Sequence, residues 1–114
     1  ENPDAILISV HQNKFPQSKY WGAQMFYGKE NELSKELAQQ LQTSFVQLLQ
    51  PDNKREIKPI TSDVYLIKHA KIPAVLTECG FLSNPQEAKK LASDEYKRQV
   101  AFAIYNGILQ FYKT

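Results

Sequence analysis

The sequence predicts an α/β domain in which helices flank a mostly parallel sheet in three layers. Two observations carry this prediction. Short apolar runs alternate with longer amphipathic stretches, and the first run, AILISV at residues 5–10, is nearly continuous. A continuous apolar run after a turn signal is typical of a strand that is buried on both faces, as strands of parallel sheets are. Strands interleaved with helices then favour a layered α/β architecture.

The remaining elements follow from periodicity and from helix start and stop signals. Apolar residues recur at helical spacing between residues 31 and 50, and Pro51 ends that stretch. Asn84 and Pro85 are a capping residue and a favoured first helical residue. The elements predicted in this way are strands at residues 23–27, 64–68 and 74–78, and helices at 31–50, 85–92 and 94–112.

Composition narrows the classes of function. The 114 residues carry a net charge of +2 and scattered basic side chains, so no nucleic-acid partner is expected. A single cysteine excludes an internal disulfide and a cysteine-based zinc knuckle. A glycine-rich phosphate loop is also missing from the sequence, which argues against a nucleotide-binding domain. The chain opens on Glu1 without a signal peptide, and we expect it to be part of a longer protein.

His11 and Glu78 stand at equivalent places in two predicted strands. His11 directly follows the run at 5–10, and Glu78 ends the predicted strand 74–78. Ligands of open α/β sheets bind at the carboxyl ends of the strands, so an imidazole and a carboxylate are expected to converge on one crevice. Neutral imidazole is a zinc ligand, and a carboxylate beside a metal-bound water can accept its proton. The pair therefore predicts metal-assisted hydrolysis.

The surrounding sequence resembles a known family. SVHQN at residues 9–13 is similar to the Ser-Ile-His-Ala-Asn signature of zinc-dependent N-acetylmuramoyl-L-alanine amidases, and PAVLTECGFLSN at 73–84 matches every fixed position of their second signature. WGAQMFYGK at 21–29 looks like the branch that acts on the spore cortex. The resemblance covers the whole chain and implies that residues 1–114 are the C-terminal part of a single amidase catalytic domain, truncated at its N-terminus.

The resemblance also implies a site. In the family, two histidines and a glutamate hold Zn²⁺, and a further glutamate is the catalytic base. His11 matches one metal ligand, Glu78 matches the catalytic glutamate, Asn13 is a candidate for orienting a ligand or the substrate, and Lys68 falls where family members often carry arginine. His69 matches no ligand, and we interpret it as a surface residue.

Two of the family's zinc ligands would lie upstream of residue 1. We therefore expect the parent protein to be the enzyme, while this fragment binds zinc weakly or not at all and is inactive. The parent's partner would be peptidoglycan glycan strands with stem peptides, in an extracytoplasmic location such as the cell wall or spore cortex. Truncation is also expected to expose a sheet edge and promote self-association. The alternative is a noncatalytic α/β module that binds glycan or a partner protein without metal.

Overall fold

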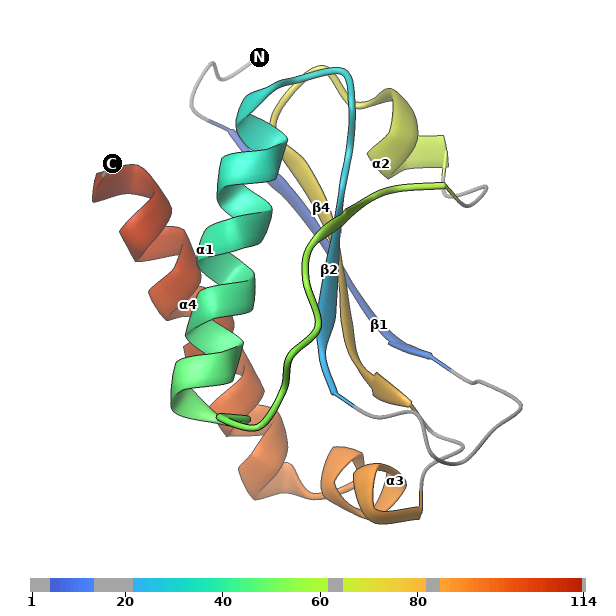
Figure 1. Cartoon of the computed structure of the whole chain (residues 1–114), viewed down its shortest axis with the longest axis vertical. Coiled ribbons are helices and arrows are strands. Elements are labelled where there is room, and N and C mark those ends of the chain that lie inside the picture. The colour runs from blue at the N-terminus through green and yellow to red at the C-terminus, as the bar shows by residue number, and fades with distance from the viewer. Residues whose placement is uncertain (1–4, 14–21, 62–64, 82–84, 114) are drawn as a thin grey trace.

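One mixed sheet of four strands organises the chain (Figure 1). The computed structural model describes residues 5–13, 22–61, 65–81 and 85–113. The strand order is β1-β4-β2-β3, in which β1 pairs with β4 in parallel, β2 with β4 antiparallel, and β2 with β3 in parallel. The strand bounds are Leu7–Asn13 for β1, Gln24–Tyr27 for β2, Lys58–Pro59 for β3 and Ala74–Phe81 for β4. The predicted α/β class is confirmed.

Helices cover both faces of this sheet, as Figure 1 shows. The long helices α1 (Leu33–Leu48) and α4 (Asp94–Lys113) pack against each other on one face. The short helix α2 (Tyr65–His69) lies on the opposite face, and α3 (Pro85–Leu91) follows the end of β4. Helices on both sides of a sheet give the three predicted layers.

The side chains of β4 alternate between two hydrophobic clusters because successive residues of a strand point to opposite faces. Val75 and Cys79 belong to the core beneath α1 and α4, whereas Ala74 and Leu76 pack with Ile67 of α2. The α1–α4 side is the larger core. In the described part of the chain, no helix combines the length and apolar character needed to cross a membrane.

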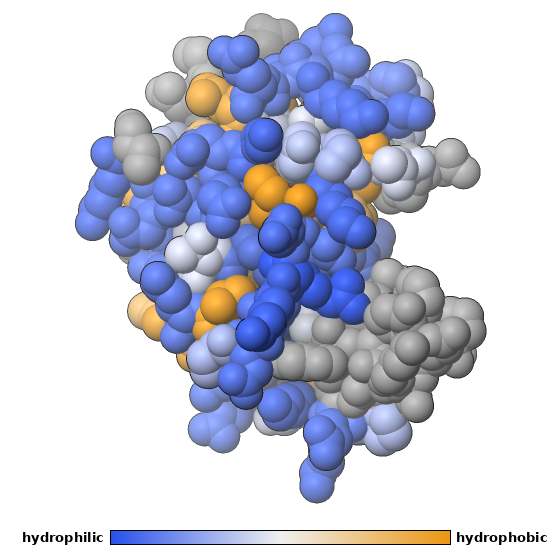
Figure 2. Space-filling model, viewed as in Figure 1, coloured by the Kyte–Doolittle hydropathy of each residue, from blue (hydrophilic) through white to orange (hydrophobic). Residues whose placement is uncertain are grey.

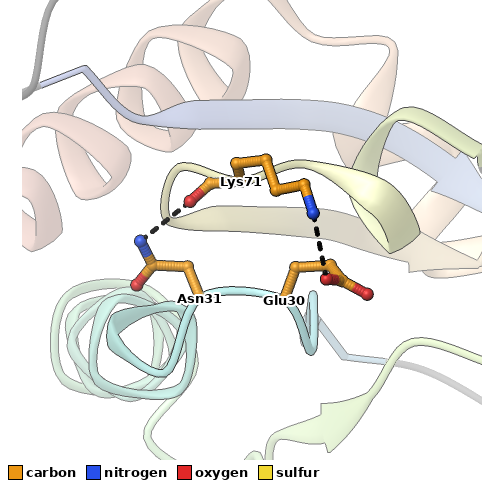
Figure 3. A network of polar contacts seen from close by, with 3 residues as sticks. All are labelled: Glu30, Asn31 and Lys71. Carbon is orange, nitrogen blue, oxygen red and sulfur yellow. Dashed lines mark hydrogen bonds and ion pairs between the residues drawn. The ribbon is translucent and has the colours of Figure 1, made fainter.

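Polar contacts join the start of α1 to the start of β4 (Figure 3). Asn31 accepts a hydrogen bond from the backbone N–H of Leu33 at 2.8 Å, which satisfies a free amide of the first helical turn. The Asn31 amide also donates to the carbonyl of Lys71 at 3.0 Å, and the Lys71 ammonium lies 3.6 Å from a carboxylate oxygen of Glu30. In addition, the hydroxyl of Ser34 accepts the N–H of Ala74 at 2.9 Å. These contacts fix where β4 enters the sheet.

Several predicted elements differ from the structure. The strand predicted at 64–68 is wrong, since residues 65–69 form α2, in which Ile67 is buried and Leu66 is exposed. The neighbours of β4 in the sheet are β1 and β2, so this short run packs on a face of the sheet instead of pairing. The two-residue strand β3 was not predicted. Both site strands are longer than predicted, so His11 and Glu78 lie within β1 and β4 instead of at their ends.

Candidate functional site

Three adjacent strands place His11, Glu78 and Gln24 in one row across the sheet. Glu78 is paired in register with His11 in the parallel β1–β4 pair and with Gln24 in the antiparallel β2–β4 pair. Residues directly opposite each other on neighbouring strands project from the same face. Glu78 projects from the same face of β4 as Leu76 and from the opposite face to Cys79. Because Leu76 packs with Ile67 of α2, the row lies on the α2 side of the sheet. In Figure 2 hydrophilic residues dominate the part of this view that is not drawn in grey, and hydrophobic ones show only as small isolated patches.

Glu78 is a buried carboxylate with an unsatisfied oxygen. Its exposed fraction is 6%, and Oε2 has no hydrogen-bond partner among the described residues. Burial raises the pKa of Glu78 above its ordinary value, and the nearby charge of His11 lowers it by a smaller amount. A raised pKa makes a carboxylate a stronger base. Burial and an open oxygen are the two features that the predicted base at Glu78 requires.

His11 lies at the surface beside this carboxylate. Its side chain is exposed, and Nε2 lies 3.0 Å from the hydroxyl of Ser9, two residues earlier on the same face. The serine hydroxyl can donate to or accept from the ring, depending on the tautomer. Asn13 closes β1 opposite Phe81, after an irregularity in the register, and its side chain lies outside the described part of the structure. Its predicted role stays a prediction.

Lys68 and His69 lie at the other end of the sheet from this row. Both are exposed on α2, whose Ile67 packs on residues 74 and 76 near the start of β4. The ring of His69 lies against that of Tyr65, with centroids 4.4 Å apart. The structure does not bring Lys68 together with Glu78, and the role predicted for Lys68 stays a prediction.

The described residues do not form a complete metal site by themselves. No group of three His, Cys, Asp or Glu side chains that could hold a metal ion occurs within residues 5–13, 22–61, 65–81 and 85–113. Cys79 is buried on the face opposite Glu78, which removes it as a ligand at this site. A surface imidazole next to a carboxylate with an open oxygen does fit a zinc site in chemistry. It is short of the three protein ligands that a catalytic zinc usually has.

Gln24 is a member of the row that the sequence analysis missed, and Arg55 is its hydrogen-bond partner. The side-chain oxygen of Gln24 accepts a hydrogen bond from Nη1 of Arg55 at 2.9 Å, and the side-chain amide of Gln24 donates to the backbone carbonyl of Glu56 at 2.7 Å. A glutamine inside an apolar strand was a usable signal. Arg55 lies in a polar connection without periodicity, and nothing in the sequence distinguished it from neighbouring charged residues.

A cavity of about 680 Å³ lies on the other face, between the end of β1 and the helices α3 and α4. His11 reaches it from the edge of the sheet, and the remaining lining is mostly apolar. The lining residues are Val10, His11, Cys79, Leu91, Tyr96, Lys97, Val100, Ala101 and Ile104. Val10 is 54% exposed on β1, which is an edge strand of the described sheet.

Known proteins are similar to this chain in sequence and in fold. The N-acetylmuramoyl-L-alanine amidase family model matches residues 1–110. The germination-specific N-acetylmuramoyl-L-alanine amidase of Bacillus subtilis is 36% identical over 107 residues, which are 94% of this chain and 44% of that protein. The amidase LytC of the same organism is 33% identical over 110 residues, covering 95% of this chain and 22% of LytC.

A solved structure agrees over the same span. The CwlD amidase from Clostridioides difficile, solved in complex with the GerS lipoprotein, superimposes with a TM-score of 0.91 at 45% identity. The match covers 98% of this chain and 57% of the CwlD chain. The present chain therefore spans about half the length, or less, of these relatives and covers their C-terminal part. The chain belongs to the N-acetylmuramoyl-L-alanine amidase family.

Proposed function

We propose that this chain is the C-terminal part of an amidase catalytic domain whose full-length protein hydrolyses the amide bond between N-acetylmuramic acid and L-alanine in peptidoglycan. The observation that carries the proposal is the buried Glu78 carboxylate, with its unpartnered oxygen, in register with the His11 imidazole. The names of the relatives support the reaction class.

Glu78 performs the proton transfers of this reaction. Its free Oε2 accepts a proton from a water molecule, whose oxygen attacks the carbonyl carbon of the scissile amide. The carbon–nitrogen bond then breaks, and Glu78 returns the proton to the departing amine of L-alanine. The raised pKa of Glu78 suits both halves of this cycle, because a carboxyl that ionises closer to neutrality is a stronger base and still a usable acid.

His11 would hold a zinc ion together with ligands that the described residues do not supply. When bound, zinc would supply Lewis-acid stabilisation of the carbonyl oxygen and acidify a water molecule. The contribution of this chain is one exposed imidazole positioned by β1 beside the base. The chain on its own therefore binds zinc weakly or not at all and does not turn over substrate.

The setting of the full-length protein follows from its relatives. Substrates are glycan strands that carry stem peptides, and the protein acts outside the cytoplasm, at the cell wall or spore cortex. The spore cortex is favoured by the similarity to a germination-specific amidase and by the germination-like segment 21–29. A lipoprotein partner of the kind found with CwlD belongs to the same proposal.

The open edge of β1 favours self-association of this chain. β1 pairs with β4 on one side only in the described sheet, and the exposed Val10 adjoins the apolar cavity. Unpaired strand edges next to apolar surface recruit further chains. Sedimentation of the purified chain should show a concentration-dependent dimer or larger species. A monomer at all concentrations would contradict this part of the proposal.

A noncatalytic module that binds glycan or a partner protein is the second candidate. The observation on its side is that the described residues contain a single imidazole at the site and no set of three ligands. Such a module would use the Glu78 face of the sheet without proton transfer. It predicts that peptidoglycan binding by the full-length protein is unchanged by substitutions at Glu78 and that no bond is cut.

Paired substitutions in the full-length protein distinguish these functions. Glu78→Gln removes the base and should abolish turnover while zinc remains bound, whereas His11→Ala should reduce both zinc content and turnover. Glu56→Gln makes the same chemical change at an exposed carboxylate of the neighbouring connection and serves as the control. Loss of zinc in Glu78→Gln, or near-normal turnover, would show that Glu78 has another role.

A further inference from the structure

An exposed apolar stripe runs along α4 on the side away from the core. The buried residues of this helix are Val100, Ala103 and Gly107, and Gly107 lies against Leu41 of α1. Four large side chains with exposed fractions between 38% and 58% form the stripe, namely Phe102, Tyr105, Leu109 and Tyr112. We call these four residues the α4 stripe. Single exposed apolar residues are common on protein surfaces, but a contiguous patch is often functional.

The α4 stripe repeats every seven residues. Tyr105 and Tyr112 are seven residues apart, and Arg98 precedes Tyr105 by the same interval. Seven residues are about two helical turns, so these side chains project in nearly the same direction, about 10.5 Å apart along the axis. Phe111 packs against the core and contacts the ring of Tyr112, with centroids 5.3 Å apart and planes at 68°. This ring is therefore braced before any ligand binds, which lowers the entropy cost of binding.

The α4 stripe is too small for a stable contact with another folded protein. A fully buried aromatic side chain contributes about 150–250 Å², so a half-exposed ring offers roughly 100 Å² and the four side chains together roughly 400 Å². A standard protein interface needs about 800 Å² from each partner. A second copy of this chain or a globular partner would have to bury mostly hydrophilic surface around the stripe. A thin, extended ligand that follows the helix axis fits the stripe better.

Cations stand at both ends of the α4 stripe. Lys97 and Arg98 are exposed at one end, and Lys113 is exposed at the other. The acidic residues of the helix, Asp94 and Glu95, belong to its first turn, where the free amides of a helix N-terminus favour carboxylates. The surface thus suits a ligand that has apolar faces along its length and anionic groups at intervals.

A glycan strand that carries stem peptides has this chemistry. The axial C–H groups of a pyranose ring form an apolar face that stacks on an aromatic ring, while the hydroxyl groups stay in water. The strand itself is neutral, and the stem peptides that branch from every second sugar carry carboxylates. Two sugar rings span about the same length as the seven-residue repeat of the helix. Tyr105 and Tyr112 therefore match equivalent sugars of neighbouring disaccharides.

We propose that the α4 stripe is a second, noncatalytic site for the glycan strand of peptidoglycan, in which Tyr105 and Tyr112 stack on sugars one disaccharide apart and Arg98 faces a stem-peptide carboxylate. The inference rests on the proposed amidase function, from which it takes the polymer. Glu78 lies on the α2 side of the sheet, and Figure 1 shows α4 on the opposite side. The stripe therefore holds the polymer without taking part in bond cleavage.

Cosedimentation with purified peptidoglycan tests this site in the full-length protein carrying Glu78→Gln, so that the polymer is not cut during the measurement. Tyr105→Ala and Tyr112→Ala should each weaken binding by about 3- to 10-fold, and the double variant by about 10- to 100-fold, as the loss of one and two aromatic contacts predicts. Tyr105→Phe and Tyr112→Phe keep the rings and should stay within about twofold. Leu48→Ala is the matched control, because it removes an exposed apolar side chain from α1 and should change binding by less than about twofold.

Turnover by the full-length protein with Glu78 intact separates this site from the catalytic one. Replacing both tyrosines by alanine should raise KM for peptidoglycan by about 10- to 100-fold and change kcat by less than about twofold, because a second contact with the polymer is lost. On a soluble disaccharide that carries one stem peptide, kcat/KM should change by less than about threefold, since so short a substrate cannot reach both faces of the sheet.

Equal peptidoglycan binding by the double alanine variant and its parent would overturn the inference. A changed oligomeric state of the variant with unchanged peptidoglycan binding would overturn it too, and would make the stripe a protein interface. Truncating exposed side chains costs little stability, so a fall in Tm of more than about 5 °C would show that the full-length fold buries the rings and would contradict the site. Ring-dependent binding by a wild-type protein that cuts no amide bond would refute the proposed function and leave the glycan site standing.

Discussion

The side chain of Gln42 in α1 forms hydrogen bonds with the backbone at the start of β2, where β3 does not pair. Its side-chain oxygen accepts the backbone N–H of Met25 at 3.0 Å, and its amide donates to the carbonyl of Ala23 at 3.1 Å. The paired part of β3 reaches only residues 26 and 27 of β2, so these earlier backbone groups have no strand partner on that side. Gln42 therefore holds the segment that places Gln24 beside Glu78.

Gln42→Leu should destabilise the folded chain by about 1–3 kcal/mol, the cost of one buried group left without a hydrogen bond. Only one group is orphaned because the carbonyl of Ala23 keeps a second donor, the amide of Asn53 at 2.8 Å. Among the described residues, Gln42 is the acceptor for the N–H of Met25, and Met25 is fully buried. Urea denaturation of the wild type and the variant measures the difference in the free energy of unfolding.

Gln47→Leu provides the control on the same helix. Gln47 is exposed, so this substitution makes the same chemical change without breaking a buried contact and should alter stability by no more than about 0.5 kcal/mol. If Gln42→Leu were as stable as Gln47→Leu, the amide of Gln42 would not be satisfying the β2 backbone, and the reasoning about how Gln24 is held would be wrong.

Three further substitutions test the packing and electrostatics of the chain. Glu78→Gln should become more stable relative to the wild type as pH rises above 4.5, the ordinary pKa of the carboxyl. Burial raises the folded-state pKa of Glu78, so the wild type loses stability when this carboxyl ionises and the variant does not. Equal pH profiles of thermal unfolding would refute this. Gly107→Ala should cost about 1–3 kcal/mol, since a Cβ there would lie 3.0 Å from the Cα of Leu41 in the α1–α4 contact, and a stabilised variant in denaturant titration would contradict that packing. Tyr96→Phe should cost about 0.5–1.5 kcal/mol through loss of the 2.9 Å hydrogen bond from Gln50, and an unchanged unfolding midpoint would show the bond to be unimportant.

The pairing of His11 with Glu78 could be predicted from sequence because it depends on local patterns. Each residue belongs to an apolar run that is recognisable as a buried strand, and two parallel strands bring equivalent positions together. The long helices could also be predicted from the sequence, because apolar residues such as Leu37, Leu41 and Phe45 recur at helical spacing.

The features that the sequence did not predict depend on contacts between distant segments. Whether residues 65–69 form a strand or a helix is not decided by so short a run, because one buried residue, Ile67, satisfies either pattern. The position of Gln24 beside Glu78 follows from the antiparallel register of β2 on β4. A register between two strands whose paired residues are 48 to 54 positions apart leaves no local trace in the sequence.

Product analysis of purified peptidoglycan treated with the full-length protein tests the central claim most directly. The account predicts that free amino groups of N-terminal L-alanine appear while the number of reducing sugar ends stays constant, and that Glu78→Gln releases none of these amino groups. New reducing ends in place of amino groups, or equal release by Glu78→Gln and the wild type, would contradict an amidase that uses Glu78 as its base.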